Sequence, residues 1–286
     1  MDFHDELIVR PGRKIDIRKI DAAENYGWND KESMVGRLAE NAKRLQELQY
    51  RIYAENRQSL LIVLQAMDAG GKDGTINHVL WSMNPQGCRS QSFKVPPNLE
   101  SAHDFLWRIH KAVPANGEVV IFNRSHYESV LVEKVHKLAP KKILEKRYDL
   151  INSFEKMLAA NRTTIVKFFL HISKEEQLKR FGERLDDKSK HWKISESDYK
   201  EREYWDDYMK AFNAAINRCS TKYAPWFVIP ANDKTFRNLA VSEILVGTME
   251  KMKPELPPPT IDVNHIRALY YRNEEEEKKE SNKKRK

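Results

Sequence analysis

The feature that most constrains the fold is a glycine-rich turn, residues 65–75 with the sequence QAMDAGGKDGT, which directly follows an apolar run over residues 60–64. The run predicts a buried strand, and residues 76–82 predict a helix. The glycines let backbone N–H groups converge on an anion, and the helix N-terminus adds partial positive charge. The order of strand, glycine turn and helix is typical of a phosphate-binding loop, in which Lys72 reaches the outer phosphates.

This loop departs from the standard Walker pattern G-x-x-x-x-G-K-[ST]. Ala66 stands where the first glycine is expected, and Asp73 follows the lysine where Ser or Thr is usual. A further acid, Asp68, lies inside the loop. Because a loop that binds ATP normally uses the Ser or Thr as a metal ligand, these departures argue against ATP as the phosphoryl donor.

The composition indicates an anionic partner, since the formal net charge is +8. The chain has no signal peptide and no apolar run near the roughly 20 residues that span a bilayer, so we expect a cytoplasmic protein and no membrane partner. It also has no recognised nucleic-acid-binding motif, and no nucleic-acid partner is expected. Cys88 and Cys219 lack metal-ligand or redox spacing and are expected to be buried or free thiols.

Strands alternate with helices along most of the chain, which predicts a parallel sheet covered on both faces. We expect three parts: an N-terminal extension with an amphipathic helix (1–56), a phosphate-loop domain (57–253) and a Pro-rich, charged, disordered tail (254–286). Further strands are predicted over residues 89–93, 119–122, 165–171 and 226–229. Helices are predicted over residues 31–56, 101–113, 140–161 and 236–251.

Residues 173–221 stand outside this alternation, because they carry no strand signal and are crowded with charged and aromatic side chains. The segment predicts two helices around a polar turn. In a phosphate-loop protein such a hairpin is typical of a lid that closes over phosphates and excludes water, and a solvated helical hairpin is the alternative. Asp206 and Asp207 within it are lid-side partners of a metal or a lysine, or part of a solvated helix face.

The predicted strand 119–122 ends in a polar cluster, Asn123 to Glu128, with the sequence NRSHYE. Ligands gather at the carboxyl ends of strands in α/β sheets, so the cluster should face the phosphate loop. Asn123 occupies the position where a magnesium-holding aspartate is usual, and Asp68 is the carboxylate that can replace it. Arg124 offers a bidentate phosphate clamp. For His126 we expect a packing or hydrogen-bonding role rather than general-base catalysis.

Taken together, these motifs resemble the family-2 polyphosphate kinases, in order and without large gaps from about residue 8 to about residue 252. The resemblance rests on five stretches, residues 66–75 (AMDAGGKDGT), 123–128 (NRSHYE), 183–187 (ERLDD), 205–208 (WDDY) and 224–231 (APWFVIPA).

The resemblance implies a three-layer α/β/α P-loop kinase fold, similar to thymidylate kinase, with a parallel central sheet and a helical lid. It implies phosphoryl transfer between inorganic polyphosphate and a nucleotide, dependent on Mg²⁺ with Mn²⁺ as the alternative ion. Asp68 would help hold the metal, Lys72 would bind the transferring phosphates, and Arg124 would clamp the nucleotide. Arg180 and Arg184 would be lid arginines that neutralise the transition state. Asp206 or Asp207 would complete the metal environment, and the sequence does not distinguish them.

The remaining contacts expected with polyphosphate or nucleotide are Ala69, Gly70, Gly71, Asp73, Gly74, Thr75, Asn123, Glu128, Arg180, Lys188 and Lys193. The residues Asn123, His126 and Glu128 resemble the class III subgroup, which implies that both AMP and ADP are acceptors. Adenine nucleotides are the expected partners, with guanine nucleotides as the alternative. Similar proteins form dimers or tetramers, so a homo-oligomer is expected, and the helix over 31–56 is a candidate contact or a core helix.

Two other functions fit parts of the pattern. One is a nucleoside or nucleotide kinase that uses ATP as donor, which Ala66 and Asp73 disfavour. The other is a non-enzymatic anion-binding module, which the concentration of charge around the phosphate loop disfavours.

Overall fold

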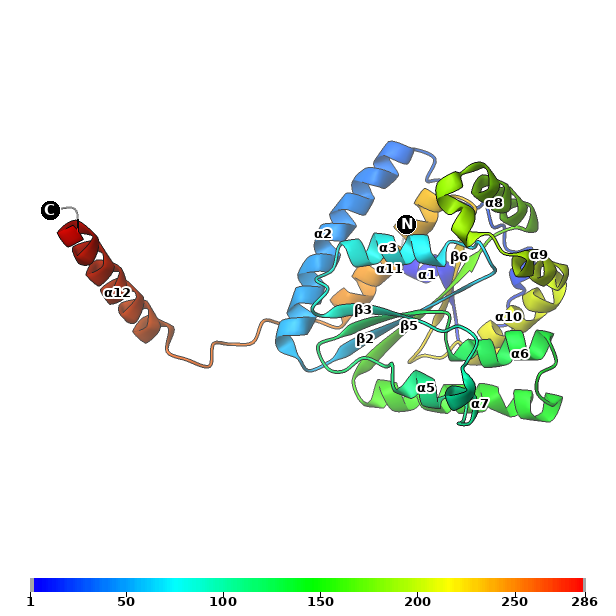
Figure 1. The fold of residues 1–286 in the computed structure, drawn as a ribbon. Helices are drawn as coiled ribbons and strands as arrows, with labels where there is room; N and C mark the ends of the chain where they lie inside the picture. Colours follow the sequence, from blue (N-terminus) through cyan, green and yellow to red (C-terminus); the bar gives the residue numbers. More distant parts are fainter. Residues whose placement is uncertain (1–2, 285–286) are drawn as a thin grey trace. The chain divides into compact units, whose positions relative to one another are not determined.

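A central sheet organises the computed structural model, which describes residues 3–284. Within these residues the sheet has six strands in the order β1-β6-β5-β2-β4-β3 (Figure 1). The strands are β1 (Ile8–Val9), β2 (Ser59–Ala66), β3 (Cys88–Ser92), β4 (Val119–Asn123), β5 (Thr163–His171) and β6 (Trp226–Pro230). Five strands are parallel, as predicted, and β1 pairs antiparallel with β6. The sequence did not predict β1, because two residues are too short to show an alternating pattern.

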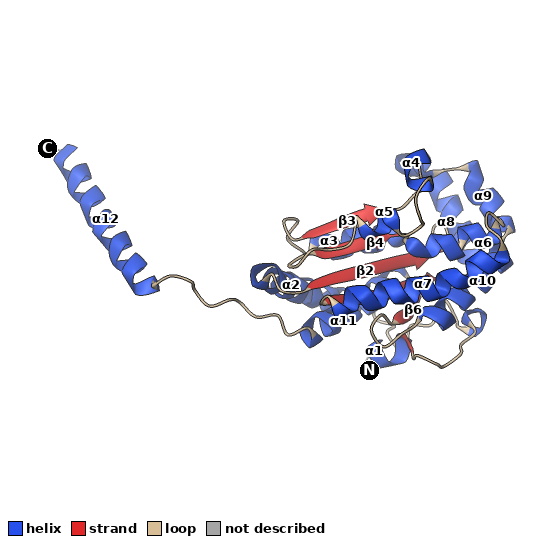
Figure 2. Ribbon diagram, turned by 90° about the horizontal axis from the view of Figure 1, so that it is seen from below, coloured by secondary structure: helices blue, strands red, loops and turns tan. Residues whose placement is uncertain are grey.

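Helices cover both faces of the sheet, so the predicted three-layer architecture is confirmed (Figures 1 and 2). One face carries α1 (Phe3–Leu7), α2 (Lys31–Glu55), α3 (Lys72–Trp81) and α11 (Lys234–Lys251). The other carries α5 (Trp107–His110), α6 (Val132–Val135), α7 (Lys141–Ala160) and α10 (Trp205–Cys219). Every residue of β2 is buried between these layers, and its end leads into the phosphate loop at the carboxyl edge of the sheet.

The amphipathic helix predicted over 31–56 is α2. Asp30 caps its start by accepting hydrogen bonds from the backbone N–H groups of Glu32 and Ser33, and Asn56 ends it in a left-handed conformation. Its apolar face is buried and packs along α11. Of the two roles left open by the sequence, the structure shows α2 as a core helix of the domain.

The segment after β5 differs from the predicted pair of helices. It forms α8 (Lys174–Asp186), a 3₁₀ turn η3 (Lys188–Lys193), α9 (Glu196–Glu203) and then α10. The apolar stripe of α10, which includes Trp205, Phe212 and Ile216, is buried in the domain core. The part that stands over the carboxyl edge of the sheet is therefore α8 to α9, which is shorter than the predicted lid of 173–221.

The short helical segments that were not predicted include α1, α6, α4 (Asn98–Ser101) and the 3₁₀ turns η1 (Ile17–Lys19) and η2 (His126–Val130). The single helix predicted over 101–113 is wrong, since α4 ends where that helix was expected to begin and α5 fills only part of the predicted range. The chain turns between them where the Asp104 carboxylate accepts a hydrogen bond from the backbone N–H of Leu106.

The chain divides into two units, Met1–Glu255 and Leu256–Lys286. The second unit contains a helix, α12 (Val263–Lys284), where the sequence predicted disorder. Its residues are mostly good helix formers, and an ion pair of 3.2 Å joins Lys278 to Glu274 one turn earlier. No helix among the described residues is long and apolar enough to cross a membrane.

Candidate active site

The phosphate loop connects β2 to α3, as the sequence predicted. Ala69 and Gly71 both have positive φ angles, 58° and 98°, which bend the chain tightly before α3 begins at Lys72. The Lys72 ammonium donates a hydrogen bond of 3.1 Å to the carbonyl of Ala66. This contact folds the lysine back across the loop, where its charge faces the same cavity as the loop glycines.

The two unusual acids of the loop are each bonded to the cluster that follows β4. Arg124 Nη2 donates to Asp68 Oδ1 at 3.0 Å, and Asn123 Nδ2 donates to Asp73 Oδ1 at 2.8 Å. The predicted approach of the two motifs is therefore present in the structure. Arg124 itself has a φ of 61°, a left-handed conformation that non-glycine residues adopt at a cost.

Two buried arginines support the loop from behind. Arg180 of α8 is 5% exposed and donates to the carbonyls of Ala69, Ala231 and Asn232 and to Glu176. Four of its five N–H donors are used in these contacts, so Arg180 holds the loop in place, and its role as a transition-state arginine stays a prediction. Arg237 of α11 is 4% exposed, and a Cβ added at Gly71 would meet its Nη1 at 2.0 Å.

The lid supplies a second set of charges. Arg184 of α8 donates to Asp198 Oδ2 of α9 at 2.9 Å and to the carbonyl of Lys193. These contacts tie α8, η3 and α9 together over the loop. Lys193 and Lys190 lie in η3 on the same cavity, and Lys190 pairs with Asp187 at 2.7 Å.

These groups line one cavity of about 820 Å³ between the loop, the end of β4 and the lid. The predicted site residues among its lining are Asp68, Ala69, Gly70, Gly71, Lys72, Asp73, Gly74, Asn123, Arg124, Arg180, Arg184 and Lys193. A second cavity of about 460 Å³ is lined by Glu128, His126, Phe105 and Arg147, among others. Phe93, Lys94, Val95 and Arg124 line both, so Arg124 lies where the two cavities meet.

Four predicted residues do not line the larger cavity or the second one. Thr75 is 1% exposed and its hydroxyl donates to the Gly71 carbonyl inside α3, whereas Lys188 is exposed on the outside of η3. Asp207 pairs with Lys210 on the surface of α10, and Asp206 lies beside it on the same first turn. Neither Asp206 nor Asp207 is in the lining of the two cavities, and the part of either acid in the metal environment stays a prediction.

A family model described as "Polyphosphate kinase 2 (PPK2)" matches residues 28–257. The chain belongs to this family. A relative from Meiothermus ruber, named AMP/ADP-polyphosphate phosphotransferase, is 49% identical over 88% of this chain and 94% of its own length. A second relative, the ADP-polyphosphate phosphotransferase of Rhodopseudomonas palustris, is 44% identical over 88% of this chain and 91% of its own.

Solved polyphosphate kinase 2 structures have the same fold. The enzyme from Arthrobacter aurescens superposes with a TM-score of 0.91 at 43% identity, covering 95% of this chain and 97% of that one. The putative polyphosphate kinase 2 from Pseudomonas aeruginosa superposes with a TM-score of 0.78 at 32% identity, covering 84% of this chain and 51% of that one.

Several residues that line or support the candidate site were missed by sequence reasoning. They are Lys94, Lys190, Asp198, Lys234 and Arg237, and the first four line the larger cavity. Asp198 was indistinguishable from its neighbours, because the phase of a short polar helix is not fixed by an apolar stripe. A signal did exist for Arg237, because it shares the apolar face of α11 with Val241 and Ile244 at helical spacing.

Burial shifts several pKa values in this polyphosphate kinase 2 site. Burial and the neighbouring Arg124 lower the pKa of Lys72. Burial raises the pKa of Glu128, although Arg124 and Lys72 oppose the shift. Burial and Asp68 raise the pKa of Asp198, while Arg184 opposes this. Because a bound phosphate chain would favour the charged form of Lys72, the cavity is suited to an anion.

Proposed function

We propose that the protein transfers phosphoryl groups from inorganic polyphosphate to AMP and to ADP, forming ADP and ATP. The observation that carries the proposal is the position of Arg124 at the junction of two cavities, one built on the phosphate loop and one lined by Glu128. The names of the relatives from Meiothermus ruber and Rhodopseudomonas palustris support the same donor.

The larger cavity is the proposed donor site. Its walls carry Lys72, Arg184 and Lys193, and the loop glycines present backbone N–H groups at the start of α3. A chain of phosphates carries about one negative charge per unit. A cavity with several cations along its walls therefore suits such a chain better than it suits one compact triphosphate. Arg184 already bonds Asp198 across the lid, which keeps its guanidinium over the loop before the donor binds.

The second cavity is the proposed acceptor site for an adenine nucleotide, with guanine nucleotides as the alternative. Phe93, Phe105 and Ile109 give it apolar walls that suit a base. Arg124 at its inner end suits the terminal phosphate of the nucleotide, because a guanidinium can bind phosphate oxygens in a bidentate manner. The cavity volume of about 460 Å³ is in the range of small-ligand sites.

The carboxylate of Asp68 fits a role in holding Mg²⁺, with Mn²⁺ as the alternative ion. It lies in the larger cavity with Oδ1 bonded to Arg124, and its backbone carbonyl accepts a hydrogen bond from Gln177. Residues 3–284 contain no group of three or more His, Cys, Asp or Glu that could hold a metal ion. Such a sparse site matches Mg²⁺, which is usually held by one or two carboxylates with phosphate oxygens and water. When bound, the ion neutralises phosphate charge during transfer.

One assay tests the proposal. The protein is incubated with AMP, Mg²⁺ and long-chain polyphosphate without any nucleoside triphosphate, and ADP and ATP are followed. We expect both products. Absence of both would refute the proposal, and phosphorylation of AMP only with added ATP would instead indicate an ATP-dependent kinase. If ADP formed and was never converted to ATP, only the assignment of ADP as an acceptor would fail.

Lys72→Ala tests the donor side of the same assay. We expect a loss of at least about a hundredfold in rate, the scale found when one preorganised electrostatic group is removed. Lys210→Ala is the matched control, because this lysine pairs with Asp207 on the surface of α10. Turnover of Lys72→Ala near that of the control would refute the role of the loop.

A homo-oligomer, a dimer or a tetramer, acting in the cytoplasm is part of the proposal. The apolar face of α2 is used inside the domain, but Val35, Tyr50 and Tyr53 of the same helix are exposed and are available for a contact between copies. Light scattering at several protein concentrations gives the mass, and a monomer at all of them would refute this part.

A further inference from the structure

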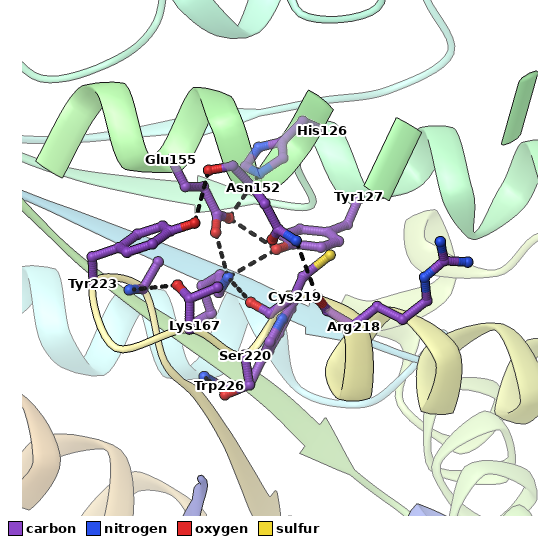
Figure 3. Close-up of polar contacts among 12 residues, drawn as sticks. His126, Tyr127, Asn152, Glu155, Lys167, Arg218, Cys219, Ser220, Tyr223 and Trp226 are labelled. Atoms are coloured by element: carbon purple, nitrogen blue, oxygen red, sulfur yellow. Dashed lines mark hydrogen bonds and ion pairs between the residues drawn. The ribbon is translucent and has the colours of Figure 1, made fainter. Parts of the chain in front are cut away.

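A buried polar network lies beneath the turn that follows β4 (Figure 3). Its centre is Lys167, a fully buried lysine in the middle of β5. The ammonium donates to Glu155 Oε2 at 2.5 Å, to the Tyr127 hydroxyl at 2.8 Å and to the carbonyl of Cys219 at 2.7 Å. A lysine has three N–H donors, so each of them has one acceptor and the ammonium is fully satisfied.

The second charged member is Glu155 of α7, which is also fully buried. Its Oε1 accepts hydrogen bonds from the Tyr127 hydroxyl at 2.9 Å and from His126 Nε2 at 3.1 Å. Burial would raise the pKa of Glu155, but Lys167 and His126 outweigh burial and lower it. Burial lowers the pKa of His126. The four side chains therefore form one ion pair, Lys167–Glu155, with His126 and Tyr127 as further hydrogen-bonding groups.

This network reaches the second cavity at His126, which is part of its lining. Ser125 separates His126 from Arg124, whose left-handed backbone must be held by its surroundings. On the upstream side, Arg124 N donates to the carbonyl of Leu64, and Gln65 Nε2 donates to Ser125 Oγ. On the downstream side, the anchors are His126 and Tyr127, whose partners are Glu155 of α7 and Lys167 of β5. Lys167 is held in turn by the Cys219 carbonyl at the end of α10.

Directional hydrogen bonds of this kind restrict the conformation of a segment more than apolar packing does. Burying a lysine and a glutamate costs solvation that well-packed apolar side chains would not lose, so the pair is not explained by stability alone. The His126–Tyr127 pair leads directly to Glu128, which lines the second cavity, and Ser129 donates back to the His126 carbonyl at 2.7 Å. The network thus holds the middle of a turn that contributes Arg124, His126 and Glu128 to the lining of that cavity.

We propose that His126, Tyr127, Glu155 and Lys167 are positioning residues that hold Arg124 and Glu128 in place for the acceptor nucleotide. This inference rests on the proposed function. None of the four is assigned contact with the reacting phosphates. Loosening the network should therefore weaken use of the acceptor while leaving the binding of polyphosphate to the loop and lid unchanged.

Tyr127→Phe tests the inference, because it removes one hydroxyl and keeps the ring. We expect kcat/KM for AMP and ADP to fall by about tenfold or more, since displacement of a positioning group by 1 Å can cost about a hundredfold. The KM for polyphosphate should stay within about twofold of the wild type. Tyr148→Phe is the matched control, because Tyr148 is equally buried but its hydroxyl accepts a hydrogen bond from Lys134 instead.

The thermal stability of both variants is measured alongside the kinetics. If Tyr127→Phe changed the acceptor and polyphosphate constants equally, or changed neither, the network would be structural only and the inference would be wrong. An inactive wild type would refute the proposed function instead, so the two failures are distinguishable.

A second variant covers the case in which Tyr127→Phe does not fold. The double substitution Lys167→Met with Glu155→Gln removes both charges together, and so leaves no unpaired buried charge. We expect it to fold and to show the same selective loss of acceptor use. Calorimetry gives an independent measure of the affinity for ADP. An affinity equal to that of the wild type in this double variant would overturn the inference. Failure of both variants to fold would also overturn it, because the network would then be needed for the fold itself.

Discussion

Gly71→Ala is the substitution for which the structure gives the sharpest expectation. Gly71 has a φ of 98°, a conformation that side chains with a Cβ rarely adopt. A Cβ built there would lie 2.0 Å from Arg237 Nη1 and 2.9 Å from its Cζ. Arg237 is 4% exposed and packed behind the loop, so its guanidinium cannot swing into solvent. The alanine must therefore move the loop, the arginine or both.

The expected destabilisation of the Gly71→Ala variant has two parts. Forcing a residue with a Cβ into a left-handed conformation costs about 1–2 kcal/mol. Overpacking a filled site costs about 1–3 kcal/mol more. Together they predict a loss of roughly 2–5 kcal/mol in the free energy of unfolding. At about 2–4 °C per kcal/mol for a domain of this size, the melting temperature should fall by roughly 4–20 °C.

Urea unfolding followed by tryptophan fluorescence measures this loss. Gly182→Ala is the matched control, because nothing lies within 4 Å of a Cβ added at Gly182 within α8. The control should be stabilised by about 0.5–1 kcal/mol, the usual gain of alanine over glycine in a helix. Adding Arg237→Ala to Gly71→Ala should remove the overpacking part, giving a coupling energy of about 1–3 kcal/mol. A Gly71→Ala protein within about 0.5 kcal/mol of the wild type would refute the steric reasoning.

Three further predictions follow from the same contacts. Arg184→Ala should reduce kcat/KM for polyphosphate and flatten its dependence on salt, because one cation leaves the donor cavity; an unchanged salt response would remove Arg184 from the path of the chain. Cys88 and Cys219 are buried with pKa values raised to about 12, so neither should react with an alkylating reagent near pH 8 until urea is added; rapid reaction in the native protein would contradict their burial. Asn123→Asp places a second carboxylate where the amide lies 2.8 Å from Asp73. Like charges raise the pKa of one acid, so activity relative to wild type should be lowest at high pH and recover as the pH falls; a pH-independent ratio would rule out the repulsion.

Much of the fold was predictable because its signals are local. The apolar run before the loop, the strand at 119–122 and the stripe of α2 each fix an element without knowledge of its neighbours. The predictions that failed concern features that depend on tertiary packing. The stripe of α10, including Phe212 and Ile216, is visible in the sequence, but its charged flanks suggested a solvent-facing hairpin. Only the contacts of α10 with α6 and α7 show that it belongs to the core.

The candidate site was predictable to the same extent. The loop and the Asn123–Glu128 cluster came together as expected, because strand ends at one edge of a parallel sheet must be neighbours. The lid could not be resolved residue by residue. The sequence singled out Asp206 and Asp207 and gave no reason to choose Asp198, whereas in the structure Asp198 of α9 lines the cavity and Asp207 of α10 pairs with Lys210. Arg180 was identified as a charge, but its carbonyl partners come from segments far apart in the chain.

The departures of the loop from the Walker pattern can now be understood as one connected arrangement. Asn123 donates a hydrogen bond to Asp73, so the acid that follows Lys72 is paired with an amide donor at the end of β4. An aspartate at both positions would set two carboxylates against each other. The carboxylate that reaches the junction of the two cavities is instead Asp68, which bonds Arg124 there. In the proposed reaction this puts the metal-holding acid and the phosphate clamp side by side, at the point where the donor and the acceptor must meet.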